Sequence, residues 1–339
     1  MEKYPKISVV LVTYNGEKTI EDCLKLFFEQ TYPKDKLEMI VADGGSTDKT
    51  LSIIKNYQKK YPKIIKLIDN PKKYKVGRGG GADIASKKAT GEFILMIDQD
   101  NLLIQKFWLK SMAEILMKNK TLSCVQSLTL IPEGGSTIDR YLGATGIEDP
   151  FAIPYSLKSE VILHPKKFEF NKKEKYFIYT ISKNDFCYGG DNGFLIRKKD
   201  FFDNKGYTQD IDNFYRMALN KHKYNVAIPL DLKVFHKTSS EFFEFVKKRG
   251  FYVRYYLREN IQHRNFYWIS LEKNNFKQNL KFVKNVFYNL IIFPRLFDGI
   301  KMAIKQKEFS WLVHPILTFA ITLNYIYSFL AVRILNKKD

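Results

Sequence analysis

The stretch Phe93-Ile94-Leu95-Met96-Ile97-Asp98-Gln99-Asp100 decides the fold of this chain. Five consecutive apolar residues are typical of a strand that is buried on both faces of a parallel sheet. The run ends in two aspartates, and burying a lone carboxylate next to such a strand is costly. Carboxylates at this spacing can share a hard divalent cation such as Mg²⁺. The alternative is that Asp-x-Asp forms a solvated turn.

Three similar apolar runs precede this strand, and helical patterns separate them. They cover residues 7–12, 39–42 and 64–68. Strands that alternate with helices predict an α/β fold with a mostly parallel sheet flanked by helices. In such sheets ligands bind beyond the carboxyl ends of the strands. Asp98, Asp100 and Asp43 follow strand ends, so this edge is the predicted site, although Asp43 before two glycines is also a common turn residue.

Three glycines, Gly79 to Gly81, are expected to precede a helix that runs through Ala89. They do not form a P-loop because no Gly-Lys-Ser/Thr follows them. They also do not follow the first strand, as the glycines of a nicotinamide-binding fingerprint do.

The second half of the chain is less regular, and long loops are expected over 132–185. Further predicted elements are strands at 193–197, 226–228 and 233–236, a helix at 209–220, and helices from 240 to the end. Asp210 and Asp212 lie at the start of the helix at 209–220, where the helix dipole alone would favour them. His236 ends a strand. It could bind a metal, or it could simply be a histidine packed against the protein.

The composition excludes several classes of protein. Hydrophobic residues make up 45% of the 339 residues, which is enough for a sizeable core and excludes wholesale disorder. The three cysteines are far apart in the sequence, so neither a disulfide framework nor a zinc module is expected. A protein from a reducing compartment is expected instead. The net charge is +20, and residues 240–339 hold 17 basic and 7 acidic side chains. Half of the excess positive charge therefore lies in the last hundred residues.

Three segments together resemble the inverting glycosyltransferases of family 2, which have the GT-A fold. They read SVVLVTYNGE (8–17), VADGGSTD (41–48) and ATGEFILMIDQD (89–100). The resemblance is close over residues 7–130, loose over 185–240 and almost absent in the last hundred residues. It implies a catalytic domain over 1–240, with a nucleotide-sugar half at 1–130 and an acceptor-side half at 131–240. Residues 241–339 would then form a helical C-terminal region.

The resemblance also implies a role for individual residues. Asp210 would be the catalytic base, and Asp98, Asp100 and His236 would hold a divalent metal, Mg²⁺ or Mn²⁺. Asp191 and Asp212 are candidates for the acceptor side. They are also the alternatives for the catalytic base if Asp210 does not have that role. The residues expected to bind the nucleotide sugar are Thr13, Tyr14, Glu17, Asp43, Arg78, Asp83 and Asp98.

Three departures from the family pattern stand out. Ala42 replaces the first aspartate of the usual Asp-Asp-Gly run, and Asp83 stands where many members have asparagine. The Gln-x-x-Arg-Trp motif of processive synthases is missing from the comparable region at 245–250. We therefore expect transfer of one sugar per encounter.

The C-terminal region combines charge with apolar sequence. Residues 311–332 carry no charged side chain, and a spanning helix needs about 20 mostly apolar residues. A shorter apolar stretch, 286–297, is ended by Pro294 and Arg295, and lysines flank both stretches. This pattern is typical of interfacial helices and membrane anchors, and a helical subdomain packed on the protein is the alternative.

The sequence thus predicts a metal-dependent, non-processive enzyme that transfers a hexose-type sugar from a nucleotide-diphosphate sugar to an acceptor hydroxyl. The expected acceptor is a saccharide, either polyprenyl-linked or at the cell surface. The expected place is the cytoplasmic side of the cell membrane, as a peripheral protein or with a single C-terminal anchor, and no nucleic-acid partner is expected. Two alternatives are a sugar nucleotidyltransferase on a similar fold and a non-catalytic basic membrane adaptor. Thr13-Tyr14-Asn15-Gly16-Glu17 stands where the first would have a glycine-rich basic loop, and the retained aspartates argue against the second.

Overall fold

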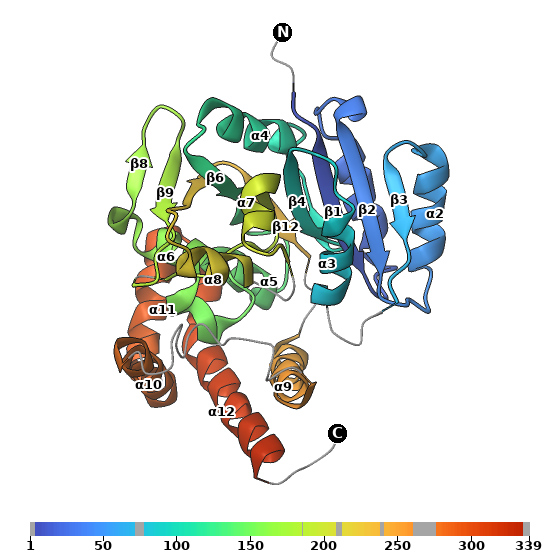
Figure 1. Cartoon of the computed structure of the whole chain (residues 1–339). Coiled ribbons are helices and arrows are strands. Elements are labelled where there is room, and N and C mark those ends of the chain that lie inside the picture. The colour runs from blue at the N-terminus through green and yellow to red at the C-terminus, as the bar shows by residue number, and fades with distance from the viewer. Residues whose placement is uncertain are drawn as a thin grey trace. The chain divides into compact units, whose positions relative to one another are not determined.

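A computed structural model describes residues 4–71, 78–184, 186–207, 212–237, 241–259 and 276–334. Within these residues nine strands form one sheet in the order β3-β2-β1-β4-β10-β6-β11-β9-β8 (Figure 1). The strands are β1 Ile7–Thr13, β2 Leu37–Asp43, β3 Ile65–Ile68, β4 Phe93–Asp98, β6 Leu122–Gln126, β8 Glu169–Asn171, β9 Tyr176–Thr180, β10 Phe194–Arg197 and β11 Asn225–Pro229. Strands β3, β2, β1 and β4 are parallel to one another, which confirms the predicted α/β fold. Strand β10 runs antiparallel to both β4 and β6.

Helices separate the parallel strands, as their sequence pattern predicts. They are α1 Ile20–Phe28, α2 Thr50–Lys60, α3 Arg78–Lys87, α4 Trp108–Lys118, α7 Lys198–Asp203 and α8 Asp212–Leu219, with 3-10 turns at Lys34–Lys36 and Pro165–Lys167. Every residue of β1 is buried, because this strand lies between β2 and β4 and both faces of the sheet are covered. Helix α4 contributes Trp108, Leu109 and Met112 to the core, all fully buried.

Two expectations about local structure are wrong. The glycines at 79–81 lie inside α3 and do not precede it. A Cβ on residue 81 would lie only 2.8 Å from Val12 Cγ1. Because glycine has no Cβ, Gly81 allows α3 to approach β1 closely. Residues 132–185 are not mainly loops, since they form α5 Thr137–Thr145, α6 Leu157–Leu163 and the β8–β9 pair. The lysine-rich turns in this segment separate short helices and strands, which are too short to give a clear pattern in the sequence.

The contacts divide the chain into two units. Residues Met1–Leu128 and His164–Lys237 form the first, here called the sheet unit, and Thr129–Leu163 and Thr238–Asp339 form the second, here called the helical unit. The segment 129–163 thus belongs with the C-terminal helices. The predicted division at residues 130 and 240 is a division by function and stays a prediction.

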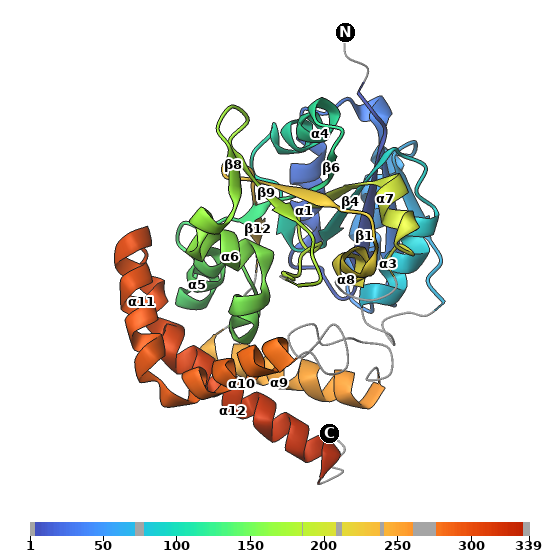
Figure 2. The same ribbon diagram turned by 60° about the vertical axis from the view of Figure 1, so that its left-hand side comes forward.

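The helical unit is built around its last helix (Figure 2). Its further elements are η3 Pro150–Tyr155, α9 Phe242–Glu259, α10 Phe276–Ile291, α11 Phe293–Gln306, η5 Phe309–Val313 and α12 His314–Arg333. Tyr141 of α5 and His314 of α12 share a buried hydrogen bond of 2.5 Å, and Arg140 pairs with the buried carboxylate of Glu308. Ile292 has a φ of +63° and Pro294 follows it, which separates α10 from α11.

One segment of the helical unit has the length and composition of a membrane span. It covers Phe309–Arg333, with a mean hydropathy of 1.6, and 39% of its most apolar window is buried inside the protein. Length and apolarity alone therefore do not decide between a lipid environment and a protein environment for this segment.

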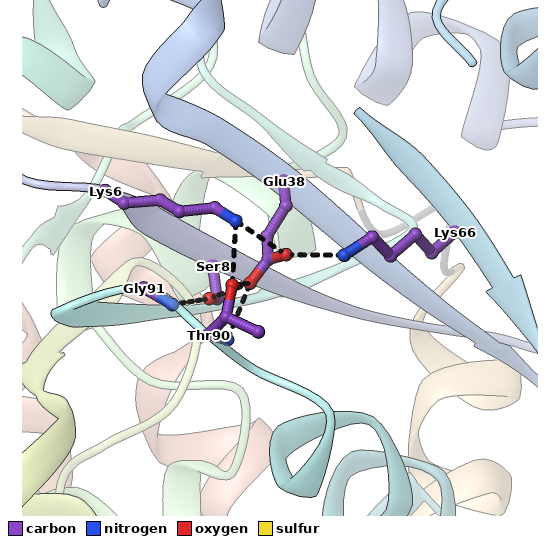
Figure 3. Close-up of polar contacts among 6 residues, drawn as sticks. All are labelled: Lys6, Ser8, Glu38, Lys66, Thr90 and Gly91. Atoms are coloured by element: carbon purple, nitrogen blue, oxygen red, sulfur yellow. Dashed lines mark hydrogen bonds and ion pairs between the residues drawn. The ribbon is translucent and has the colours of Figure 1, made fainter. Parts of the chain in front are cut away.

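A buried carboxylate joins β1, β2 and β3 at the amino ends of the parallel strands (Figure 3). Glu38 accepts hydrogen bonds from Ser8 Oγ at 2.6 Å and from the Thr90 amide and hydroxyl at 2.7 and 2.8 Å. It also pairs with Lys6 at 3.1 Å and Lys66 at 2.8 Å. Burial raises the pKa of Glu38, but these hydrogen bonds and charges outweigh it and hold the pKa well below its usual range. The cluster lies at the sheet edge opposite the predicted site.

Replacing Glu38 with glutamine is expected to lower stability by about 2 kcal/mol at pH 7, since it leaves two half-exposed lysines without their buried partner. A group with a depressed folded-state pKa stabilises the fold above its unfolded pKa, and this stability is lost as the pH falls. The difference in melting temperature between wild type and Glu38→Gln should therefore be full at pH 7 and shrink below about pH 4.5. A difference that grows on acidification would contradict this assignment.

Candidate active site

Three predicted site residues lie side by side at the carboxyl edge of the sheet. Thr13 ends β1, Asp43 ends β2 and Asp98 ends β4. The register pairs Thr13 with Asp43 and Val12 with Asp98, so the three ends are level with one another. Parallel pairing thus brings together residues that are up to 85 positions apart in the chain.

Asp43 organises the loop that follows β2. Its Oδ1 accepts hydrogen bonds from Thr13 Oγ1 at 2.9 Å and Ser46 Oγ at 2.6 Å. Its Oδ2 accepts from the amides of Gly45 at 2.8 Å and Ser46 at 2.7 Å. Both carboxylate oxygens are thus engaged twice, and a contact with a nucleotide base would have to replace one of these bonds.

The loops after β1 and β4 are joined by a residue that the sequence did not single out. Gln99 Oε1 accepts a hydrogen bond from the Tyr14 amide at 2.9 Å, and Gln99 Nε2 donates to the Tyr14 carbonyl at 3.0 Å. A Cβ on Gly16 would lie 2.2 Å from Gln99 Oε1, so glycine is needed where the loops meet. The exposed ring of Tyr14 therefore has a fixed backbone beneath it. The only signal for Gln99 was its position between two aspartates.

Glu17 contacts the start of α2. Its Oε2 accepts a hydrogen bond from the Lys49 amide at 3.1 Å, and its own amide donates to Asp48 Oδ2 at 3.1 Å. This exchange fixes the loop after β1 against the helix. The predicted role of Glu17 in nucleotide binding stays a prediction.

The first turn of α3 packs at the same edge of the sheet. A Cβ on Gly81 would approach both Val12 and Ala42, which are near the ends of β1 and β2. Ala42 is fully buried there, so an aspartate at this position would place a carboxylate in the core. Backbone amides at a helix N-terminus favour a phosphate group.

Two predicted residues belong to α3. Arg78 is its first residue, and its side chain lies outside the described part of the structure. Asp83 is buried and pairs with Lys87 one turn later at 2.9 Å. A charged contact within the helix is thus established for Asp83, and its contact with the diphosphate stays a prediction.

Asp100 and His236 lie together, although 136 positions separate them. Strand β12, Lys233–His236, pairs antiparallel with β5, Asn101–Leu102, and places His236 opposite Asn101. His236 Nε2 is 3.2 Å from Asp100 Oδ1, and the Lys237 amide donates to the Asp100 carbonyl at 3.0 Å. The side chain of Asp100 is 29% exposed and that of His236 is 11% exposed, so a ligand can reach the pair.

The donor atoms fit the metal that the family resemblance implies. A carboxylate and an imidazole nitrogen within hydrogen-bond distance can both bind Mn²⁺, and Asp98 adds a second carboxylate two residues away. Among the described residues no three His, Cys, Asp or Glu side chains come close enough to form a metal site by themselves. Phosphate oxygens of the donor would therefore complete the coordination, as is common for Mg²⁺.

Asp191 lies at the same edge, in the loop before β10. Because β10 is antiparallel to β4 and pairs Phe194 with Met96, its first residue is next to the carboxyl end of β4. Buried Gln126 at the end of β6 holds this loop, since its Nε2 donates to the Asp191 carbonyl at 3.2 Å and its Oε1 accepts from the Gly190 amide at 2.8 Å. Asp191 is thus positioned on the predicted acceptor side of Asp98.

The predicted base, Asp210, lies outside the described residues. Asp212 is the first residue of α8, and its side chain is not described either. The helix itself is firmly placed, because Phe214 packs edge-on against Phe194 with ring centres 5.4 Å apart. A Cβ on Gly189 would lie 2.7 Å from the Phe214 ring, so the loop before β10 is in contact with the start of α8. The assignments of Asp210 and Asp212 stay predictions.

These features define an α/β protein with polar and acidic side chains gathered at the carboxyl edge of its sheet. The model of the family described as Glycosyl transferase family 2 matches residues 8–198. The chain belongs to this family, and it is a nucleotide-sugar glycosyltransferase.

Two curated relatives come from different kinds of organism. The dolichyl N-acetyl-alpha-D-glucosaminyl phosphate 3-beta-D-2,3-diacetamido-2,3-dideoxy-beta-D-glucuronosyltransferase of Methanococcus voltae is 26% identical over 330 residues, 95% of each chain. The poly(ribitol-phosphate) beta-N-acetylglucosaminyltransferase of Staphylococcus aureus is 38% identical over 112 residues, which are 33% of this chain and 19% of that protein.

A solved structure confirms the fold. The mannosyltransferase of Pyrobaculum calidifontis, in complex with GDP-Man and Mn²⁺, superposes with a TM-score of 0.54 at 16% identity, over 96% of this chain and 88% of that one. The predicted GT-A architecture, with a mostly parallel sheet and C-terminal helices, is therefore confirmed.

Replacing Asp43 with alanine is expected to weaken donor binding more than it slows the chemical step. The loss of four hydrogen bonds releases the loop at 44–46, and a contact made equally in ground and transition states affects KM and not kcat. We expect KM for the donor to rise at least about tenfold with kcat within a few-fold. A large fall in kcat at unchanged KM would contradict the placement of Asp43 in the nucleotide pocket.

Proposed function

We propose that this enzyme transfers one sugar, with inversion and with the help of a divalent metal, from a nucleotide-diphosphate sugar to a hydroxyl of a lipid-linked saccharide. The observation that carries the proposal is the contact of Asp100 with His236 at the edge where β1, β2 and β4 end. A pair of metal ligands beside a nucleotide site is the arrangement that a diphosphate leaving group requires.

The acceptor is inferred from the relatives. The Methanococcus voltae protein, which matches along nearly its whole length, is named for a dolichyl-phosphate-linked sugar acceptor. The Staphylococcus aureus protein is named for a poly(ribitol-phosphate) acceptor, but it matches over only 33% of this chain. A lipid-linked acceptor also agrees with a basic C-terminal region that carries a segment of membrane-span length. We place the enzyme at the cytoplasmic side of the cell membrane.

Within this proposal each part of the site has a defined task. The loop fixed by Asp43 and the backbone of Tyr14 hold the nucleoside, and the first turn of α3 faces the diphosphate. Asp100 and His236 would hold the metal, with Asp98 beside them, and a bound divalent ion would neutralise charge on the leaving diphosphate. Asp210 takes the proton from the acceptor hydroxyl as it attacks the anomeric carbon. Attack from the side opposite the leaving group inverts that carbon, so a single carboxylate base is sufficient.

The test is release of nucleoside diphosphate from a panel of nucleotide sugars, with and without Mn²⁺. Release that needs both the metal and a polyprenyl-phosphate-linked sugar supports the proposal. Release of pyrophosphate from a nucleoside triphosphate and a sugar phosphate would favour the nucleotidyltransferase instead. A thermal-shift screen of the same panel identifies the base and the sugar, because a bound donor stabilises the folded protein.

A further inference from the structure

Helix α11 has three distinct faces. Its buried face consists of Gly299, Met302 and Ala303. A charged face carries Asp298, Lys301 and Lys305, which are exposed. The third face is both apolar and exposed, and it consists of Phe293, Leu296, Phe297, Ile300 and Ile304, between 37% and 75% exposed. The spacing of these five residues places them on one stripe of the helix. An amphipathic helix normally buries such a stripe, and here it faces away from the protein.

Helix α10 repeats this arrangement. Its buried face contains Asn285 and Asn289, and its exposed lysines are Lys277, Lys281 and Lys284. The exposed apolar residues, spaced by three or four, are Phe276, Leu280, Val283, Phe287 and Ile291. Two successive helices thus each present an apolar stripe with a row of lysines beside it.

Helix α12 also presents an apolar stripe, but its other face is bound into the helical unit. The exposed residues are Ile316, Leu323, Tyr327, Leu330 and Ile334, preceded by Leu312 in η5. On the inner face, Thr322 accepts a hydrogen bond from Asn289 at 2.9 Å, and Asn324 donates to the Val246 carbonyl at 2.5 Å. The helix packs against α9, α10 and α11.

Two further contacts of α12 involve charged side chains. Arg254 of α9 donates to Ser328 Oγ at 3.0 Å, and Tyr325 donates to Asp149 Oδ2 at 2.9 Å. If α12 crossed a bilayer, these contacts would break or the charges would enter the hydrocarbon, and either is costly. The polar side chains that interrupt the apolar stretch therefore bind protein partners.

Exposed large apolar side chains are concentrated in this part of the molecule. Between residues 276 and 334 most of them lie on the stripes of α10, α11 and α12 named above, which we call the outer stripes. In the rest of the described structure they are scattered, at Tyr14, Ile104, Phe107, Phe170, Leu219, Phe243 and Phe251. Exposed apolar stripes on three neighbouring helices indicate an interaction site.

The charge of the segment indicates the partner. Residues 276–334 contain six lysines and two arginines but only Asp298 and Glu308 as acids, and Glu308 is buried against Arg140. Lysines beside an apolar stripe fit a surface that is apolar within and anionic at its rim, which describes a membrane containing anionic lipids.

We propose that the outer stripes of α10, α11 and α12 insert into one leaflet of an anionic membrane and that α12 does not cross it. Each helix would lie in the interface with its apolar stripe among the acyl chains and its lysines at the headgroups. This rests on the proposed membrane location of the enzyme and makes it specific. The lipid-linked acceptor would be met in the same leaflet.

The first experiment measures binding of the purified full-length protein to vesicles. Phosphatidylcholine vesicles are compared with an equal mixture of phosphatidylcholine and phosphatidylglycerol. Wild type should sediment with the mixed vesicles and less with the neutral ones. The double variant Phe297→Glu with Ile304→Glu should bind the mixed vesicles at least about tenfold more weakly, because it places charge in the acyl region. Lys301→Gln with Lys305→Gln should lose about twentyfold on mixed vesicles only.

Phe170→Glu is the matched control, since it also adds a charge at an exposed phenylalanine but lies outside the outer stripes. It should bind like wild type. Metal-dependent hydrolysis of the soluble donor without vesicles shows that each variant is folded, and it also separates failure of this proposal from failure of the proposed function. Equal binding to both vesicle types, unchanged in the glutamate variant, would overturn the proposal. The proposal would also be overturned if wild type formed a dimer in vesicle-free solution and the double variant Phe297→Glu with Ile304→Glu did not.

The second experiment asks on which side of the membrane α12 ends. The native cysteines, Cys23, Cys124 and Cys187, are all buried, so a cysteine introduced at an exposed position is labelled selectively. Lys55→Cys marks the sheet unit, and Arg333→Cys marks the end of α12. In inverted membrane vesicles an impermeant maleimide should label both positions. Protection of Arg333→Cys together with labelling of Lys55→Cys would mean that α12 spans the membrane.

Discussion

Replacing Asp100 with alanine is expected to abolish turnover and to leave the fold intact. The side chain is partly exposed at a strand end, and its described contacts are with His236 and Asn101. The Lys237 amide donates a hydrogen bond to the Asp100 carbonyl, and this backbone contact survives the change. Loss of a metal ligand next to the leaving group should lower kcat by about 10³-fold, which corresponds to about 4 kcal/mol of lost charge stabilisation. Initial rates over a range of Mn²⁺ concentrations, with melting temperature as the measure of folding, test this.

A matched control is available on the neighbouring helix. Asp22 is an exposed carboxylate that pairs at 3.2 Å with Lys237, the residue directly after His236. Asp22→Ala should leave turnover and its metal requirement unchanged, since a surface ion pair contributes little. His236→Gln should instead raise the metal concentration needed for half-maximal rate. Full metal-dependent turnover in Asp100→Ala would contradict the assignment of Asp100 and His236 as metal ligands.

The first half of the fold could be predicted because its signals are local. Buried parallel strands give continuous apolar runs, so β1, β2, β3 and β4 are visible in the sequence within two or three residues of their ends. The carboxyl edge, and with it Thr13, Asp43 and Asp98, follows from the parallel topology. The family resemblance implies that Asp100 and His236 hold a metal. The pairing of β5 with β12 brings their side chains to 3.2 Å, and their role as metal ligands stays a prediction.

Other features could not be predicted because they depend on contacts between distant residues. Gln99 joins two loops through its side-chain amide, and nothing in its own neighbourhood indicates a partner 85 positions away. The Glu38 cluster draws its hydrogen-bond donors from three segments that are far apart in the sequence. The polar residues of α12 have partners that are distant in the sequence; Asn324, for example, donates to the carbonyl of Val246 in α9.

Replacing Asp210 with asparagine is expected to lower kcat about 10²–10⁴-fold, the usual cost of losing a general base. Asparagine is nearly isosteric with aspartate and can accept a hydrogen bond from the acceptor hydroxyl, but it cannot take the proton. Donor affinity should stay within a few-fold, because Asp43, Asp98 and Asp100 are unchanged. The measurement is kcat with a saturating acceptor, together with the dissociation constant of the donor.

The controls for this prediction come from the two other acidic residues near the acceptor side. Asp212 begins α8, and Asp191 lies in the loop that contacts α8 through Gly189 and Phe214. If Asp210 is the base, Asp212→Asn and Asp191→Asn should change kcat far less than Asp210→Asn does. Near-normal kcat in Asp210→Asn would move the base elsewhere, with Asp212 the first alternative.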